Sequence, residues 1–214
     1  MTSLCRSGIT LFLAIQLAFV SSTKSPEPRF LETIELGVGH KDPKPRFLKT
    51  IELGVGPKDA DGFRDEMKIF NIDYTGSEDM MSNAAFVVTQ KWREVDLVVI
   101  GVAELGFDPH KDVDFKKVFA KARKIGLELC PPDVAPQLQL QYPEQPIGEQ
   151  VVIGMTPITD SDNNLGLFLV GRLQAGFFLE SYVEDGLWLS SYVGGKNDLA
   201  LFPDQQLVFV RPRK

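Results

Sequence analysis

The sequence predicts an α+β fold, with a helix-rich N-terminal half of about three helices and a C-terminal antiparallel sheet or partial barrel of about six strands. Three observations lead to this prediction. Apolar residues recur at helical spacing in the first half, whereas the second half carries short apolar runs separated by turn-forming residues. Between the halves, Pro131 and Pro132 remove two backbone donors and fix two φ angles. We therefore expect a helical region with one buried strand over 59–126 and a β-rich region over 127–214.

The first 22 residues have the features of a secretory signal peptide. Arg6 supplies the positive charge, and Ile9 to Val20 forms an apolar run that only Thr10 and Gln16 interrupt. This run is too short to cross a bilayer about 30 Å thick as a helix, which takes roughly 20 residues. We predict cleavage after Ser22, a secreted mature protein and no transmembrane segment after cleavage. An uncleaved anchor and a mis-assigned start codon are the alternatives.

A tandem duplication of 17 residues follows the signal. It fills most of the segment 23–58, and its second copy ends at Asp59. Residues 26–42, PEPRFLETIELGVGHKD, match residues 43–59, PKPRFLKTIELGVGPKD, with three differences, Glu27/Lys44, Glu32/Lys49 and His40/Pro57. Each copy holds a candidate strand, FLxTIEL, that ends at a Gly-Val-Gly turn. We expect the second copy to be built into the fold. The first copy is expected to be a spare arm, disordered or paired as an edge strand, with strand addition to a partner as an alternative.

Two helices are expected directly after the repeat. The first begins near Asp59, with Asp59 or Asp61 suited to cap it, and its apolar residues at helical spacing are Phe63, Met67 and Phe70. The second begins at Ser77, and its apolar stripe consists of Met80, Met81, Ala84, Ala85 and Val88.

A buried strand and a third helix complete the helical region. The run Val95–Ala103 is almost entirely apolar and rich in β-branched residues, which favours a buried strand, with a short helix as the alternative. The third helix covers Val113–Ile125 and stops at Gly126. Its five outward cations are explained by a solvated helix face, with an acidic partner or an anionic membrane surface as the alternative.

The β-rich region is expected to begin with a strand around Leu138, because apolar and polar residues alternate from Leu138 to Tyr142. The other candidate strands lie between turn-forming residues, and they cover Gln150–Met155, Leu165–Leu173, Phe177–Tyr182, Leu187–Tyr192 and Leu207–Arg211. A small, strongly bent antiparallel sheet or partial barrel is the natural closure of such a set.

Charge argues against a nucleic-acid partner. The chain has a net charge of -6 and a pI near 5.0, whereas non-specific nucleic-acid binding depends on lysine and arginine to neutralise phosphates. The cations at the C-terminus, Arg211, Arg213 and Lys214, are expected to form a solvated tail.

Cys130 is the only cysteine after signal cleavage, so no intramolecular disulfide is expected. A thiol–imidazole pair with His110 would be the usual way to activate it. The third helix separates the two residues by roughly 20 Å, however, so we expect a buried and inert cysteine instead. The other histidine, His40, is discounted because the second repeat copy has Pro57 at its position.

No metal and no cofactor are predicted. The run Asp160-Ser161-Asp162-Asn163-Asn164 imitates the start of a calcium loop. It lacks the glycine of the sixth position, where Leu165 stands, and the glutamate of the twelfth, where Gly171 stands. A turn between strands is therefore the expected structure, with a weak calcium site as the alternative.

Several motifs together resemble a family of uncharacterised bacterial proteins. They are VAELGF within residues 95–107, the stretch LELCPPDVAPQLQLQYPEQP followed by TDSD within 126–162, DGLWL at 185–189 and the terminal VFVRPRK. The similarity runs from about Thr50 to the C-terminus, and it implies no activity, catalytic residue or cofactor. The signal and the duplicated opening depart from the family, whose members look intracellular. We follow the signal on compartment.

Two hypotheses of function remain. The first is a secreted, non-enzymatic binding or interaction module that presents Tyr182, Trp188 and Tyr192 to an unknown ligand or protein partner. The second is a glycan-directed hydrolase that pairs Glu149 with Glu184 or Asp185 within about 10 Å. The sequence contains no P-loop, dinucleotide-binding glycine pattern, zinc-ligand spacing or Gly-x-Ser-x-Gly elbow, which favours the non-enzymatic hypothesis.

Overall fold

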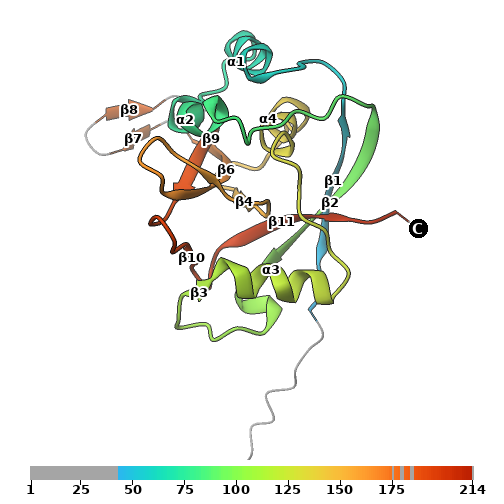
Figure 1. The fold of residues 1–214 in the computed structure, drawn as a ribbon. Helices are drawn as coiled ribbons and strands as arrows, with labels where there is room; N and C mark the ends of the chain where they lie inside the picture. Colours follow the sequence, from blue (N-terminus) through green and yellow to red (C-terminus); the bar gives the residue numbers. More distant parts are fainter. Residues whose placement is uncertain (1–42, 175, 179–180, 184–185, 214) are drawn as a thin grey trace, which may run out of the picture. The chain divides into compact units, whose positions relative to one another are not determined.

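One mixed sheet joins strands from both halves of the chain, in the order β1–β2–β11–β4–β6–β5, and β9 also pairs with β6 (Figure 1). The computed structural model describes residues 43–174, 176–178, 181–183 and 186–213. The strands of this sheet are β1 Arg46–Leu53, β2 Arg93–Gly101, β4 Gln150–Ile153, β5 Ile158–Thr159, β6 Leu165–Leu173, β9 Gly186–Val193 and β11 Gln206–Arg211. β11 runs antiparallel to β2 but parallel to β4.

The expected division into a helical first half and an antiparallel second half is wrong. The described residues form four α-helices, α1 Ala60–Ile69, α2 Glu78–Ser82, α3 Phe115–Lys124 and α4 Val134–Gln141, and the last of these lies in the second half. Conversely, β1 and β2 from the first half are strands of the main sheet. The fold is α+β with a seven-stranded mixed sheet, because strands distant in sequence pair with one another.

The helix α4 stands where the alternation from Leu138 to Tyr142 predicted a strand. The glutamines of this stretch hold partners on several strands rather than facing solvent. Gln139 Nε2 donates to the backbone oxygens of Gly171 and Trp188, and Gln141 Nε2 donates to that of Glu52. Since polar as well as apolar residues of α4 are buried, the segment shows no one-sided helical pattern in its sequence.

The second repeat copy forms β1, which pairs antiparallel with β2. Ile51 and Leu53 are buried in the core. The Gly-Val-Gly turn follows, and Gly54 has a φ of +75° there, while a Cβ at this position would lie 2.3 Å from the backbone oxygen of Lys91. Both observations require glycine. The signal peptide and the first repeat copy lie outside the described residues.

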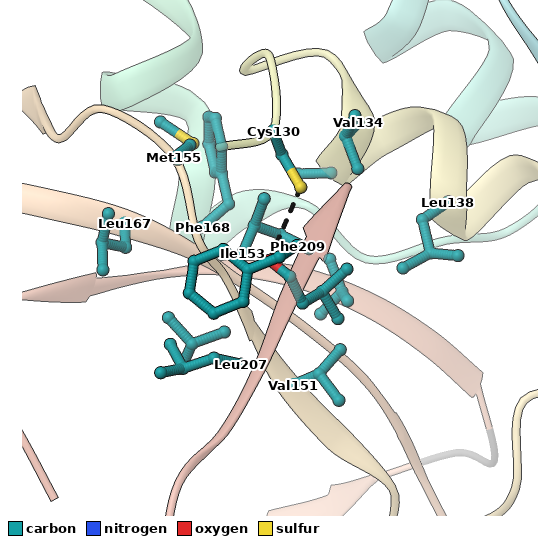
Figure 2. Close-up of a cluster of buried hydrophobic side chains, with 14 of the residues drawn as sticks. Cys130, Val134, Leu138, Val151, Ile153, Met155, Leu167, Phe168, Leu207 and Phe209 are labelled. Carbon is teal, nitrogen blue, oxygen red and sulfur yellow. Dashed lines mark hydrogen bonds between the residues drawn. The ribbon is translucent and has the colours of Figure 1, made fainter. Parts of the chain in front are cut away.

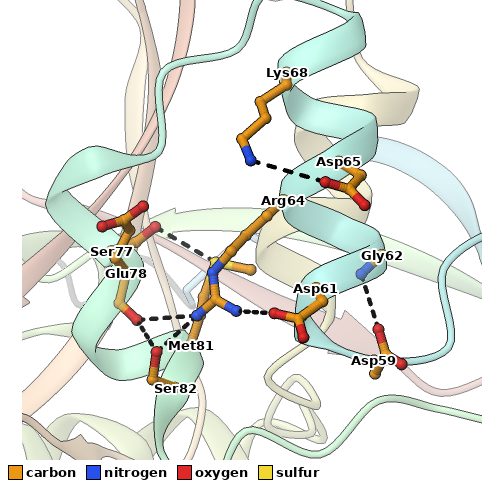
Figure 3. Close-up of polar contacts among 10 residues, drawn as sticks. All are labelled: Asp59, Asp61, Gly62, Arg64, Asp65, Lys68, Ser77, Glu78, Met81 and Ser82. Carbon is orange, nitrogen blue, oxygen red and sulfur yellow. Dashed lines mark hydrogen bonds and ion pairs between the residues drawn. The ribbon is translucent and has the colours of Figure 1, made fainter.

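The expected helix after the repeat is confirmed as α1 (Figure 3). Asp59 caps it by accepting a hydrogen bond from Gly62 N at 2.8 Å. Arg64 joins α1 to α2, because its Nη2 donates to Ser82 Oγ at 2.7 Å. The second helix is shorter than expected. Asn83 ends it in an extended conformation, and its side chain donates to the backbone oxygen of Thr159 at 2.9 Å.

Short elements complete the described part of the chain. The third helix begins at Phe115, two residues later than expected. The residues before it form β3, Val113–Asp114, which pairs with β10, Ala200–Leu201. A hairpin of β7, Gly176–Phe178, and β8, Ser181–Val183, replaces the single strand expected over 177–182. Two 3-10 turns cover Thr75–Ser77 and Ala103–Leu105. No helix within the described ranges is long and apolar enough to cross a membrane.

The core is built on both sequence halves. Figure 2 shows Cys130 and Val134 packed with Ile153, Phe168 and Phe209. Phe209 of β11 also meets Phe119 of α3 edge-on, with ring centroids 5.8 Å apart. Such edge-to-face pairs add to the stabilisation from burial alone.

Arg211 and Arg213 are exposed, as expected, but both side chains have partners and so do not belong to a free tail. Arg213 binds both carboxylate oxygens of Asp96, Nη2 to Oδ1 at 2.7 Å and Nε to Oδ2 at 2.9 Å, and it also pairs with Glu94. Arg211 Nη2 donates to the backbone oxygen of Pro45 at 3.2 Å. These contacts bind the end of the chain to β2 and to the start of β1.

Candidate functional site

The segment 72–76 extends the sheet at the free edge of β9. Asp73 N donates to the backbone oxygen of Leu187 at 3.1 Å, and Leu189 N donates to that of Asp73 at 2.6 Å. Ser191 Oγ donates to the backbone oxygen of Gly76 at 2.7 Å. These bonds fix the segment alongside Trp188, although the two are more than a hundred residues apart in sequence.

Trp188 is positioned by its neighbours on β6 and α4. It is the register partner of Gly171, and a Cβ added to Gly171 would lie 2.5 Å from Cζ2 of the indole. Only glycine leaves room for the ring at this point. Gln139 Nε2 holds the backbone oxygen of Trp188 at 2.7 Å. The indole Nε1 is buried and has no hydrogen-bond partner among the described residues.

Two pockets share Trp188 in their walls, and a third pocket adjoins the second of them. The first has a volume of about 440 Å³, and the second, of about 500 Å³, shares the wall residues Asp73, Thr75, Leu173 and Trp188 with it. The third has a volume of about 300 Å³, and it shares the wall residues Gln150 and Leu169 with the second. Because neighbouring pockets share walls, they adjoin, and we call them together the Trp188 groove. Its lining comes from 68–76, 150–152, 169–173, 186–192 and 202–206.

Two of the three predicted aromatic residues line this groove. Trp188 belongs to the first two pockets and Tyr192 to the third. The hydroxyl of Tyr192 donates to the backbone oxygen of Ala200 at 2.6 Å, and its ring meets that of Phe202 edge-on at 6.2 Å. Burial raises the pKa of this hydroxyl. The side chain of Tyr182 lies outside the part of the chain that the structure describes.

The groove also carries polar groups that both donate and accept hydrogen bonds. Asn71, Thr75, Gln150, Ser190 and Gln205 line it. Asp73 Oδ1 accepts hydrogen bonds from Thr75 N at 3.0 Å and Thr75 Oγ1 at 2.8 Å, which orders this wall. Apolar walls with a few placed polar groups are typical of small-molecule sites.

The carboxylate pair of the hydrolase hypothesis is not brought together by any described contact. Glu149 is not among the lining residues of the Trp188 groove, and its Oε2 is buried with no partner among the described residues. It lies near Tyr142, because burial and the charges of Glu149 and Glu144 raise the pKa of that hydroxyl. Glu184 and Asp185 lie outside the described residues, so the expected separation stays a prediction.

Cys130 is buried and free, as the sequence predicted. Its Sγ contacts the backbone oxygen of Val208 at 3.5 Å, and burial, followed by the nearby Asp133, raises the pKa of the thiol (Figure 2). His110 lies on an exposed turn, where its backbone N donates to Asp108 Oδ1 at 3.0 Å. A thiolate at Cys130 is therefore disfavoured at neutral pH.

Asp160 closes a turn between β5 and β6. Its carboxylate accepts hydrogen bonds from Asp162 N at 2.9 Å, Asn164 N at 2.7 Å and Asn164 Nδ2 at 3.0 Å. These donors lower the pKa of Asp160, and they form the turn between strands that the sequence predicted. In the described ranges, no group of three or more histidine, cysteine or acidic residues is placed to hold a metal.

Sequence reasoning missed the residues that shape the groove. Gln139 was predicted to lie in a strand. Asp73 and Ser190 belong to no recognisable sequence motif, so nothing singled them out. Gly171 gave the one usable signal, because a glycine inside a strand often marks the close approach of a neighbouring group.

No protein-family model, curated protein or solved structure matches this chain. The resemblance noted from the sequence motifs stays a prediction, and the function is argued from the groove.

Proposed function

We propose that this protein is a secreted, non-enzymatic binding module that holds a carbohydrate chain in the Trp188 groove. The observation that carries the proposal is the place of Trp188 on the shared wall of two adjoining pockets of about 440 and 500 Å³. Volumes of this size suit small organic ligands. Pockets in series suit a ligand built from repeated units.

The chemistry of the lining supports a sugar as the occupant. Sugar rings present C–H faces that pack on aromatic rings, and Trp188 and Tyr192 supply such rings. Their hydroxyl groups need partners that donate and accept, as amide and hydroxyl side chains do. Gln150, Ser190 and Gln205 provide these groups along the groove.

Among the described lining residues of the groove, the placement of the carboxylates supports binding over hydrolysis. A hydrolase needs two carboxyl groups on either side of the scissile bond. The carboxylates among the described lining residues are Asp73 and Asp204, and they line different pockets, Asp73 the first two and Asp204 the third. Asp73 already accepts two hydrogen bonds from Thr75.

The test is a glycan-array screen of the chain beginning at Thr23, followed by calorimetry with the best ligand. Trp188→Ala should weaken binding tenfold or more, because buried aromatic anchors dominate binding energy. Trp92→Ala is the matched control, since Trp92 is 62% exposed and lies outside the groove. A folded protein that binds no glycan on the array, or equal loss in both variants, would overturn the proposal.

Fluorescence gives an independent readout. Trp92 and Trp188 are the only tryptophans, so Trp92→Phe leaves Trp188 as the sole indole. Addition of the bound glycan should shift or quench its emission in this variant. Trp188→Phe, with only the exposed indole left, should show no change.

A further inference from the structure

A second segment of the same chain has almost the same sequence as the strand β1. Residues 29–36, RFLETIEL, and the β1 residues 46–53, RFLKTIEL, differ at one position. The buried side chains Ile51 and Leu53 correspond to Ile34 and Leu36. Every apolar side chain that β1 places in the core is therefore available in the first copy as well.

The residues behind a cross-strand contact of β1 and the turn that follows it are also duplicated. Thr50 Oγ1 donates to Asp96 Oδ1 at 2.6 Å, and Thr33 is its counterpart. Gly54 has to be glycine, because its φ is +75° and Lys91 approaches it, and the first copy has Gly37 there. The backbone requirements of the strand and its turn are thus met twice in the sequence.

The outer edge of β1 is already occupied at Glu52. Glu52 N donates to Gln141 Oε1 at 2.8 Å, and Gln141 Nε2 donates to the backbone oxygen of Glu52 at 2.8 Å. The amide of Gln141 thus takes the place of a neighbouring strand at this residue. At this residue, a first copy that paired with β1 by simple addition would have to displace Gln141, whereas replacement of β1 would keep the contact.

Two of the three differences between the copies lie at contacts. Lys49 Nζ forms an ion pair with Glu144 and lies 5.0 Å from the ring centroid of Tyr142. Glu32 in its place would set a carboxylate against Glu144. Pro57 is buried, and a Cβ on Gly62 would lie 3.2 Å from its Cβ, so the bulkier His40 fits poorly. The third difference, at Lys44, is on an exposed residue.

We propose that the surface of β2 that receives β1 is a binding site for either repeat copy, and that Lys49 and Pro57 select the second copy. Residues 29–36 are the alternative occupant, from the same chain. When they take the site, residues 43–59 become a loop that leads back to Ala60. The proposal is independent of the ligand of the Trp188 groove.

The first test deletes one copy at a time from the chain beginning at Thr23. Deletion of 43–59 joins the first copy directly to Ala60, and deletion of 26–42 retains the second copy. Both variants should unfold in one cooperative thermal transition, with the first-copy variant melting about 2–8 °C lower. Glu32→Lys should restore most of this loss and His40→Pro the rest.

Glu27→Lys is the matched control, because its counterpart Lys44 is exposed. It adds the same charge as Glu32→Lys at a position without a described contact, and it should leave the Tm of the first-copy variant unchanged. A first-copy variant without a cooperative transition, or equal rescue by the two lysines, would overturn the proposal.

The second test traps the occupant in the chain with both copies. Thr50 and Asp96 are register partners, so a T50C/D96C pair should form a disulfide rapidly. The T33C/D96C pair should form a disulfide slowly. With E32K and H40P added, which remove the preference for the second copy, this disulfide should form at least tenfold faster. No trapping of T33C in either background, or trapping only between two molecules, would contradict the proposal.

Discussion

The side-chain amide of Gln139 donates to the backbone oxygen of Trp188 at 2.7 Å and to that of Gly171 at 3.2 Å. One side chain of α4 thereby binds β6 and β9 at the register pair Gly171 and Trp188. The candidate site depends on this contact, because the position of Trp188 follows from the backbone that carries it.

Substitution of Gln139 should destabilise the protein. Gln139→Leu removes a buried donor from two backbone oxygens, and we expect the free energy of unfolding to fall by about 1–3 kcal/mol. Urea unfolding followed by circular dichroism measures this change. Gln174→Ala, at an exposed position, is the control. A loss no larger than that of the control would mean that the two bonds do not contribute to stability.

Gly171→Ala should displace the indole of Trp188. The added Cβ would lie 2.5 Å from Cζ2 of Trp188 and 2.9 Å from the backbone oxygen of Glu149, so the ring or the strand has to move. Overpacking of this kind costs about 1–3 kcal/mol of stability, and the emission of Trp188 should shift in the Trp92→Phe background. Gly186→Ala is the control, because no atom lies within 4 Å of a Cβ there. Equal effects of both changes would contradict the described packing.

Cys130 should be unreactive in the folded protein. Its thiol is buried, and burial raises its pKa, so neither access nor the thiolate form favours reaction. In the chain beginning at Thr23, Cys130 is the only cysteine, and a thiol reagent such as DTNB should modify it only after addition of denaturant. Rapid modification of the native protein would show that the thiol is accessible.

Asp96 should contribute stability that is lost in acid. Its hydrogen bonds with Arg213, and then with Thr50, lower the pKa of Asp96 from 3.8 to about 2. A lowered pKa in the folded state means that the contribution is fully present above about pH 4 and is lost as pH falls toward 2. Asp96→Asn should therefore be less stable than wild type at pH 7, and the difference in Tm should shrink between pH 4 and pH 2.5. A constant difference over this range would argue against the ionised pair.

Local patterns in the sequence were sufficient for several elements. Asp59 and the spacing of Phe63 and Met67 specified α1, because a cap and an apolar stripe act within a few residues. The β-branched run at 95–103 predicted β2, which covers Arg93–Gly101, for the same local reason. Cys130 was correctly expected to be buried.

The candidate site was predictable only in part. Trp188 and Tyr192 were predicted to bind a ligand or partner, and both line the Trp188 groove. Asp73 and Gln150 were not, since their role depends on strands that pair across long stretches of sequence. Nothing in the local pattern of residues 71–76 indicates that they lie against β9.

The sequence by itself determined where α1 and α3 form and that the second repeat copy holds a strand before them, because these features depend on neighbours within one or two helical turns. The tertiary structure alone decided that α4 is a helix and that both halves share one sheet. The alternating glutamines of α4 look like the polar face of a strand, yet the side-chain amides of Gln137, Gln139 and Gln141 donate to backbone oxygens of distant segments. Hydrogen-bond partners that far along the chain exist only once the fold has formed.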